Sequence, residues 1–390
     1  MRATPVIVIS PLYPPLRGGL ADHTEHLARL LAEGRKVELV TSSEGASSGT
    51  GDHAARIGAV VDDWKSTAVL EAAITKCDPE AAIVWQYVPH MYGRGGVNHA
   101  LPQAMANLRR SGRRQFLIAH EIAAPYFWLP NRWWYAWSHR RQWRNIIPSM
   151  EGIAISTEAW LVDWRQRIPE LGPKAWLSPS PSHISESPIS EDARRAWRAS
   201  QGWAGSDMKV MASFGSLGTS RLFDWVEGAW RHACEKEGIR ACLAVVGAQT
   251  DYRPPQPLAN QFRSLGYLPE EQVSGLLQCA DLLLFPFIDG VSERRTSVMA
   301  GLAHGRPVLT TIGHNTGPRL RGSDGFKAVA ATQPEAFAVA ASELLKDPTG
   351  ANALGRRARV LYDEQFDWRI VIHRLTERLD CLKDNSSPRL

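Results

Sequence analysis

The sequence predicts an α/β protein built from two doubly wound, parallel-sheet domains. Short apolar runs, such as VIVIS at 6–10 and VELVT at 37–41, alternate with amphipathic segments of helix length. A Ser- and Pro-rich stretch at 178–195 interrupts this alternation, which starts again with KVMAS at 209–213. The length of 390 residues also exceeds what one hydrophobic core usually serves. Two successive α/β domains account for both the pattern and the length.

The expected elements divide between these domains. The first domain, residues 1–180, has predicted strands at 6–10, 37–41, 81–85, 115–119 and 152–156, and helices at 20–33, 66–76, 98–110 and 134–147. The second, residues 207–365, has predicted strands at 209–213, 241–246, 282–287 and 307–311, and helices near 220–237, 270–278, 295–304 and 333–346. Residues 181–206 are predicted to be a linker, because they contain no buried strand and begin in the Ser- and Pro-rich stretch. Residues 366–390 are predicted to form the C-terminal helix, with FDW at 366–368 marking the break from the preceding helix.

Composition and charge narrow the class of protein and of ligand. Lys and Arg total 45 against 40 for Asp and Glu, a formal charge of +5, which suits an anionic ligand or a membrane surface. Because there is no long basic run, we expect no nucleic-acid partner. The five cysteines are scattered without a CxxC pair, so neither a zinc site nor a disulfide framework is indicated. With no signal peptide and no apolar stretch of about 20 residues, we expect a cytoplasmic protein.

Ligands of open α/β sheets bind beyond the carboxyl ends of the strands, so the residues that follow each strand are the candidates. Gly18 and Gly19 lie where the first strand turns into a helix. They would let backbone N–H groups approach an anion, or would simply form a tight turn. His120 and Glu121 follow the strand at 115–119. A histidine in this position can hydrogen-bond a substrate hydroxyl, or it can be satisfied by neighbouring backbone groups.

The loop FGSLGTSR at 214–221 follows the first strand of the second domain. Ser216 and Arg221 flank this loop, and an arginine there can pair bidentately with phosphate oxygens. The alternative is a solvated arginine at a helix start, although a cation is less expected at that end of a helix. The loop is therefore a candidate phosphate site.

The stretch DGVSERRTSVMAGLAHGRP at 289–307 carries the most information. Asp289 and Gly290 signal a turn after a buried strand. Ser292 is expected to cap a helix that begins near Glu293. The small residues that follow would allow this helix to pack closely against the sheet.

Two arginines stand at the expected start of that helix. Arg294 and Arg295 do not suit the positive end of a helix dipole. A bound anion explains them, because the helix N–H groups and both arginines would then face negative charge, together with Thr296 and Ser297. Pairing of the arginines with surface carboxylates is the alternative.

Several motifs, in order, make the whole chain resemble a glycosyltransferase of family 4. They are PPLRGGLADHT (14–24), AHE (119–121), FGSLGTSR (214–221), LAVVGA (243–248), LGYLPEEQVSGLLQCADLLLFPF (265–287), AGLAHGRPVLTT (300–311) and FDW (366–368). The resemblance covers roughly residues 6–375. It implies the GT-B fold, in which two Rossmann-like domains face each other across a cleft and a final helix, here 366–390, crosses back to the first domain.

The resemblance also implies a function. The family moves a hexose, with retention and without a metal, from a nucleotide-diphosphate-sugar to a hydroxyl acceptor in glycan, polysaccharide or glycoconjugate biosynthesis. The C-terminal domain would bind this donor, with no further cofactor, and the N-terminal domain would bind a sugar, a lipid-linked molecule or another small acceptor. Gly18 and Gly19 would approach the donor diphosphate, and His120 would contact the donor hexose. The acceptor side would be lined by Glu121, Tyr87 and His90.

The chain departs from the family at its paired glutamates. These are eight residues apart in the family, and their positions fall on Ser292 and Ala300. The first glutamate normally holds the sugar ring and the second holds the ribose. Asp289 and Glu293 are the candidates to replace the first by a small shift, and the replacement would hydrogen-bond the sugar hydroxyls, whereas no nearby residue is an obvious replacement for the second.

The phosphate loop departs as well. The family has a GR pair followed by a lysine, where this chain has Gly215-Ser216 followed by Arg221. We expect Arg221, Arg294 and Arg295 together to offset the missing cation. The missing glutamates leave one alternative open, a catalytically silent GT-B protein that acts as a sugar-binding or partner subunit. A third hypothesis is another GT-B enzyme, such as a nucleotide-sugar epimerase or a phosphorylase, but the resemblance of LGYLPEE and AHGRP to family 4 argues against it.

The segment YFWLPNRWWYAWSHRRQWR at 126–144 interleaves tryptophans with arginines. Three interpretations are open for it. It is a domain helix with core tryptophans and solvated arginines, an interfacial helix on an anionic membrane surface, or a wall of the acceptor site on which sugars stack. The second interpretation would place the protein peripherally at the inner face of the membrane.

Overall fold

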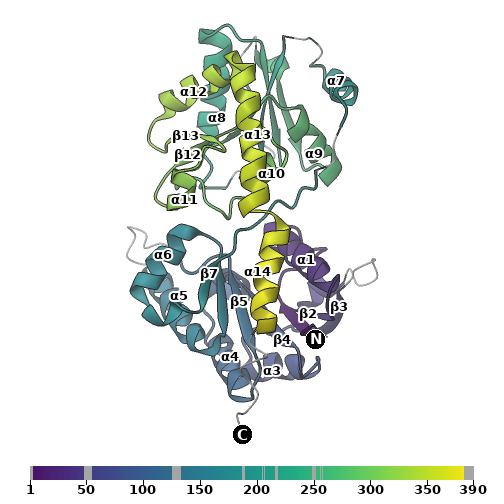
Figure 1. Cartoon of the computed structure of the whole chain (residues 1–390), viewed down its shortest axis with the longest axis vertical. Helices are drawn as coiled ribbons and strands as arrows, with labels where there is room; N and C mark the ends of the chain where they lie inside the picture. Colours follow the sequence, from purple (N-terminus) through teal and green to yellow (C-terminus); the bar gives the residue numbers. More distant parts are fainter. Residues whose placement is uncertain are drawn as a thin grey trace. The chain divides into compact units, whose positions relative to one another are not determined.

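The computed structural model of the protein describes residues 3–47, 55–124, 133–186, 189–203, 205, 207–215, 218–247, 252–254, 256 and 258–381. The chain divides into two compact units (Figure 1). Unit 1 consists of Met1–Pro179 together with Arg369–Leu390, and unit 2 consists of Ser180–Trp368.

Unit 1 contains a seven-stranded parallel sheet with the order β3-β2-β1-β4-β5-β6-β7. Its strands are β1 (Val6–Ile9), β2 (Val37–Thr41), β3 (Arg56–Val60), β4 (Ala82–Tyr87), β5 (Gln115–Ala119), β6 (Gly152–Ile155) and β7 (Ala175–Leu177). The sequence analysis missed β3 and β7. Both lie at the edges of the sheet, where β3 is half exposed and β7 has only three residues, so neither produces a long apolar run.

The helices of unit 1 are α1 (Gly19–Ala32), α2 (Ser43–Ala46), α3 (Thr67–Thr75), α4 (Ala100–Arg110), α5 (Trp133–Ile146), α6 (Glu158–Arg167) and α14 (Trp368–Cys381). From Arg369 onward, α14 belongs to unit 1, although it is the last helix of the chain. The Thr4 hydroxyl donates to the carbonyl of Leu379, and Arg35 pairs with Asp380 at 3.1 Å. These contacts tie the C-terminal helix to the residues that precede β1 and β2 of the same unit.

Unit 2 contains a six-stranded parallel sheet with the order β10-β9-β8-β11-β12-β13. Its strands are β8 (Lys209–Phe214), β9 (Ala241–Val246), β10 (Phe262–Gly266), β11 (Leu282–Phe285), β12 (Val308–Ile312) and β13 (Lys327–Ala330). The helices are α7 (Glu191–Ser200), α8 (Phe223–Arg231), α9 (Glu270–Cys279), α10 (Thr296–Ala303), α11 (Pro318–Arg321), α12 (Pro334–Lys346) and α13 (Pro348–Gln365), with α13 beside α10 (Figure 1). The strands missed by the sequence analysis, β10 and β13, again form the two edges.

The segment 181–206 differs from the expected linker. It belongs to unit 2 and contains α7, whose first turn is capped by the Ser190 hydroxyl, which accepts from the Ala193 N–H at 3.1 Å. Trp197 of α7 packs against Trp203, with ring centroids 5.8 Å apart, and Trp203 is only 2% exposed. Trp203 belongs to the core of unit 2 and the half-buried Trp197 packs against that core, so the segment is part of unit 2 despite its polar composition.

The strand order of each sheet reverses beside its first strand. The reversal falls between β1 and β4 in unit 1 and between β8 and β11 in unit 2. The connections that leave two such neighbouring strands diverge, and ligands of doubly wound sheets bind there. The predicted residues Gly18, Arg221 and Asp289 all lie on connections that leave these strands.

Candidate functional site

Arg221 and Arg295 lie on the two connections at the reversal point of unit 2. Arg221 forms an isolated antiparallel bridge with Phe287, and the Ile288 N–H donates to the Ser220 carbonyl at 2.9 Å. The two guanidinium carbons lie over the Phe287 ring, 4.8 Å from its centroid for Arg221 and 4.2 Å for Arg295. The cation–π contacts thus hold two like charges, distant in sequence, on one aromatic side chain.

Arg221 is a half-buried residue whose guanidinium group is largely enclosed. Its Nη2 donates to the Phe214 carbonyl, and its Cζ lies 5.3 Å from the centroid of Phe285. Its Nε and Nη1 atoms are buried and have no hydrogen-bond partner within the residues that the structure describes. Burial, and secondly the positive charge of Arg295, lowers the pKa of Arg221 to about 9. An anion in contact with these N–H groups would relieve both the lost hydration and the repulsion.

Asp289 lies on the connection between β11 and α10, where several polar side chains converge on its carboxylate, and it is 7% exposed. Arg295 donates to its Oδ1 atom, and Arg294 lies 3.8 Å from its Oδ2 atom. Asn315 donates to the same Oδ2 atom at 2.9 Å, and Arg295 also donates to the Ser220 hydroxyl at 3.0 Å. The alternative in which both arginines pair with a carboxylate therefore applies here, but the carboxylate is buried. Asp289 orients Arg295, a role that the sequence analysis did not foresee.

Gly290 forms the turn that places Asp289. Its φ is +85°, and a Cβ atom built on it would lie 2.1 Å from the backbone nitrogen of Gly313. The connection beyond β11 is anchored to β12 at the same point, because the Val291 N–H donates to the Thr311 carbonyl at 2.8 Å. Only glycine fits this combination of backbone angle and close approach.

The start of α10 corrects one expectation. The helix begins at Thr296 rather than near Glu293, and Ser292 does not cap it. Residues 292–295 form a turn in which the Arg295 N–H donates to the Ser292 carbonyl at 3.0 Å, and the buried Ser292 hydroxyl has no partner within the described part of the chain. Glu293 is 1% exposed. Thr296 and Ser297 are therefore the first two residues of the helix, and the Thr296 N–H already donates to the Arg294 carbonyl at 3.1 Å.

The end of β8 meets the start of α10. A Cβ atom built on Gly215 would lie 3.5 Å from Ser297 Cβ and 3.0 Å from Arg221 Nη2. The missing side chain at Gly215 leaves backbone, a helix N-terminus and a cation within a few ångströms of each other. This combination is a recognised anion-binding arrangement. Ser216, also expected to bind the donor, lies outside the described residues.

In unit 1, His120 lies at the end of β5. Its Nε2 atom lies 2.6 Å from the side-chain oxygen of Gln86, to which it donates in the tautomer that carries the proton on Nε2. The ring of His23, from α1, stands edge-on to the ring of His120, with centroids 4.5 Å apart. The amide nitrogen of Gln86 is buried and has no partner within the described residues. Three polar side chains from α1, β4 and β5 thus meet near the reversal point of this sheet.

The other predicted residues of unit 1 have different outcomes. Tyr87 is fully buried, and its hydroxyl accepts from Gln142 at 3.0 Å, so it belongs to the core and does not line an acceptor site. Burial raises its pKa. His90 is exposed and Glu121 is half-buried. Gly18 precedes α1 and Gly19 begins it, and nothing lies within 4 Å of a Cβ atom built on either one.

The described residues contain no group of three or more His, Cys, Asp or Glu side chains arranged to hold a metal ion. Within the same residues, no helix combines the length and the hydropathy that crossing a bilayer requires.

Comparison with known proteins identifies the architecture. Residues 209–347 match the family model for glycosyl transferases group 1, and no curated protein matches the chain significantly. Sucrose-phosphate synthase from Thermosynechococcus elongatus is similar with a TM-score of 0.73 and 14% identity, covering 98% of this chain and 100% of that chain. HepE from Anabaena, in complex with UDP and glucose, is similar with a TM-score of 0.72 and 12% identity. The likeness covers 97% of this chain and 100% of that chain.

The chain has the GT-B fold. A third structure with this likeness is the UDP-forming α,α-trehalose-phosphate synthase from Burkholderia xenovorans, in complex with glucose-6-phosphate. Its TM-score is 0.67 at 12% identity, and the likeness covers 97% of this chain and 100% of that chain. The segment 209–347 includes Arg221 and the whole of 289–297, so the arginine site lies within the matched part of the GT-B protein.

Sequence reasoning missed four residues of these two clusters: Gln86, His23, Ser220 and Asn315. Gln86 gave a usable signal, because a polar residue in a fully buried strand such as β4 needs a partner. Ser220 and Asn315 follow β8 and β12, where the search for residues beyond strand ends would have found them. His23 lies inside a helix, where the sequence offers no sign that it points toward β5.

Proposed function

We propose that the protein is a glycosyltransferase that uses a nucleotide-diphosphate-sugar donor, bound by unit 2. The observation that carries this proposal is the enclosed Arg221 guanidinium with two buried N–H groups left open, next to Arg295 and the start of α10. A diphosphate supplies the two negative charges that this arrangement lacks. The match of residues 209–347 to glycosyl transferases group 1 supports the same assignment.

The geometry supports a division of roles. Arg221, Arg295 and the N–H groups at the start of α10 would stabilise the charge that develops on the leaving diphosphate. Asp289 would hold Arg295 in place, because both its oxygens are already engaged by Arg295, Arg294 and Asn315. Asp289 and Glu293 are also the candidates for contact with the sugar hydroxyls. In unit 1, His120 would position the donor hexose through a ring held by Gln86.

We further propose that transfer proceeds with retention and without a metal, by attack on the donor face that the diphosphate leaves. The bond between C1 of the sugar and the phosphate oxygen breaks, and the acceptor oxygen bonds to C1. The acceptor proton passes to the leaving phosphate, which departs as the nucleoside diphosphate. The arginines then offset the charge that a divalent cation offsets in other enzymes. The acceptor would be a sugar, a lipid-linked molecule or another small hydroxyl compound.

UDP-sugars are the first donors to test, because the similar HepE structure contains UDP and glucose. Thermal unfolding with UDP-, GDP-, ADP- and dTDP-sugars would identify the nucleotide, since a specific ligand raises the melting temperature by mass action. Hydrolysis of the stabilising donor would then be measured with and without EDTA. We expect Arg295→Ala to lower this turnover by orders of magnitude while the protein stays folded, and near-wild-type turnover would defeat the assignment.

A catalytically silent sugar-binding or partner subunit is the second candidate. The observation in its favour is Ala300, which is fully buried in α10 and stands where the family has its ribose-binding glutamate. Donor binding without any hydrolysis or transfer would select this candidate over the enzyme.

A further inference from the structure

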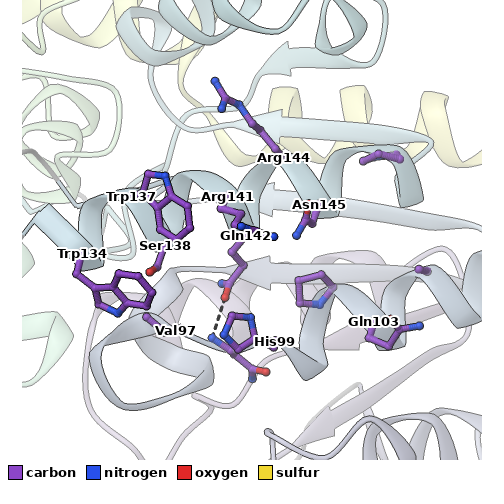
Figure 2. Close-up of a pocket in the computed structure, with 14 residues that line it drawn as sticks. Val97, His99, Gln103, Trp134, Trp137, Ser138, Arg141, Gln142, Arg144 and Asn145 are labelled. Atoms are coloured by element: carbon purple, nitrogen blue, oxygen red, sulfur yellow. Dashed lines mark hydrogen bonds between the residues drawn. The ribbon is translucent and has the colours of Figure 1, made fainter.

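A groove of about 540 Å³ lies on unit 1 between α4 and α5. We call it the α4–α5 groove. Its lining residues come from these helices and their adjoining connections: Val97, Asn98, His99, Pro102, Gln103, Ala106, Trp134, Trp137, Ser138, Arg141, Gln142, Arg144, Asn145 and Pro148. Figure 2 shows the tryptophans, Arg141 and Asn145 following one another along α5, with His99 and Gln103 on the side of α4. None of these residues belongs to the sites described above.

Two tryptophans give the groove an aromatic surface. Trp134 is 60% exposed and Trp137 is 45% exposed, and their ring centroids lie 5.3 Å apart at an angle of 31°. The guanidinium carbon of Arg141 lies 5.4 Å from the centroid of Trp137. Exposed indoles that adjoin one another in a concave surface are typical of binding sites, because covering them removes a large apolar area from water. The flat C–H face of a pyranose ring matches such a surface.

A buried hydroxyl between the tryptophans points to a polar ligand. Ser138 is 6% exposed, and its Oγ atom has no hydrogen-bond partner within the residues that the structure describes. A buried hydroxyl without a partner is costly, so a group that bonds to it gains free energy. The amides of Gln103 and Asn145 lie in the same groove, and an amide both donates and accepts, as hydroxyl-rich ligands require.

The charge of the groove selects among polar ligands. Its described lining contains Arg141, Arg144 and His99 but neither Asp nor Glu. Arginines bind carboxylates and phosphates through charge-assisted hydrogen bonds. We propose that the α4–α5 groove binds an anionic saccharide, one that carries carboxylate, sulfate or phosphate groups, at a site separate from the nucleotide-sugar site of unit 2.

A membrane surface is the competing partner for exposed tryptophans near arginines. The amides and the buried Ser138 hydroxyl argue against it, because a flat bilayer interface cannot reach polar groups inside a groove. Trp133 provides the matched control. It is 51% exposed and adjoins Trp134 in sequence, but it does not line the groove. A membrane-docking face would use both Trp133 and Trp134, whereas a saccharide in the groove would contact Trp134 and not Trp133.

The test is calorimetric titration of the full chain, without nucleotide, with trigalacturonate, a heparin-derived tetrasaccharide and the neutral maltotriose. We expect at least one anionic probe to bind about tenfold more tightly than maltotriose. Trp134→Ala and Trp137→Ala should each weaken that binding about tenfold, and Arg141→Gln should remove most of the preference for the anionic probe. Trp133→Ala should bind like the wild type. Because these side chains are exposed, unchanged melting temperatures would confirm that the variants fold.

Three outcomes would overturn the proposal. The first is no binding of either anionic probe, and the second is binding that Trp134→Ala leaves unchanged. The third is flotation of the protein with phosphatidylglycerol-containing vesicles that both Trp133→Ala and Trp134→Ala abolish, which would assign the surface to lipid. Because the titration contains no nucleotide, failure of the donor site would not affect it.

Discussion

Replacing Arg221 by methionine tests whether this arginine binds the donor or only stabilises the fold. Burial and the charge of Arg295 lower the pKa of Arg221 to about 9. At about 1.4 kcal/mol per pKa unit, this shift means that keeping Arg221 charged costs the folded protein roughly 4–5 kcal/mol at most. Because the residue is only half-buried, its contact with solvent reduces this cost to about 2–3 kcal/mol. The bond to the Phe214 carbonyl and the contacts with Phe285 and Phe287 return about 1–2 kcal/mol. We therefore expect Arg221→Met to raise the free energy of unfolding of unit 2 by about 0–2 kcal/mol.

The same substitution should remove most of the response to the donor nucleotide. At a UDP concentration of about 100 times the wild-type dissociation constant, binding stabilises the protein by about 2.7 kcal/mol. Loss of two charge-assisted hydrogen bonds raises the dissociation constant about 100-fold, which leaves about 0.4 kcal/mol. For a unit of this size, the shift in melting temperature would fall from about 5–11 °C to under about 2 °C. Thermal unfolding with and without UDP measures both effects.

Arg306 supplies the control for this experiment. It is also largely enclosed, and burial is the main cause that lowers its pKa, to about 10. It donates to the Ala280 carbonyl, which precedes β11 and so lies at the amino end of the parallel strands, whereas Arg221 follows the carboxyl end of β8. Arg306→Met should keep the full response to UDP. A large loss of stability in Arg221→Met, together with an unchanged shift on UDP addition, would show that Arg221 is a structural cation and would refute the reasoning.

Three further predictions concern a turn, a helix start and a histidine. Gly290→Ala should destabilise unit 2 by about 3 kcal/mol or more in chemical denaturation, because the new Cβ atom would lie under 3 Å from the backbone of Gly313. A loss of unfolding free energy below about 1 kcal/mol would contradict the observed turn. Gly19→Ala should leave the free energy of unfolding within about 0.5 kcal/mol of wild type, because nothing lies within 4 Å of the new methyl group. It should lower donor turnover if the diphosphate approaches this backbone. Unchanged turnover would remove Gly19 from the donor site. Burial lowers the pKa of His304, so the unfolded chain takes up a proton more readily, and stability should be full above about pH 7 and fall as the pH drops below about 6.5. His304→Gln should flatten that part of the profile of melting temperature against pH, and an unaltered profile would assign the dependence to other groups.

The central strands and the reversal points could be predicted, because central parallel strands are buried on both faces and so form apolar runs. The edge strands β3, β7, β10 and β13 could not, because a strand with one solvated side produces a weaker pattern. The helix in 181–206 was missed for a related reason. Its Trp197 packs, half-buried, against the core of unit 2, and the helix contacts α9, so the partners that stabilise it are distant in sequence.

The sequence by itself determined the fold class, the connections that carry the candidate residues and the concentration of charge at 289–297. These features follow from short stretches of sequence, because the spacing of apolar residues and the turn-forming residues depend only on residues a few positions apart. The tertiary structure decided the partners of the charges. It placed Arg221 and Arg295 on one phenylalanine, engaged Asp289 with Arg295, and buried Tyr87 in the core. It also turned the Trp- and Arg-rich helix α5 into one wall of a groove, because only the packing of α4 beside it shows which tryptophans are covered and which remain open.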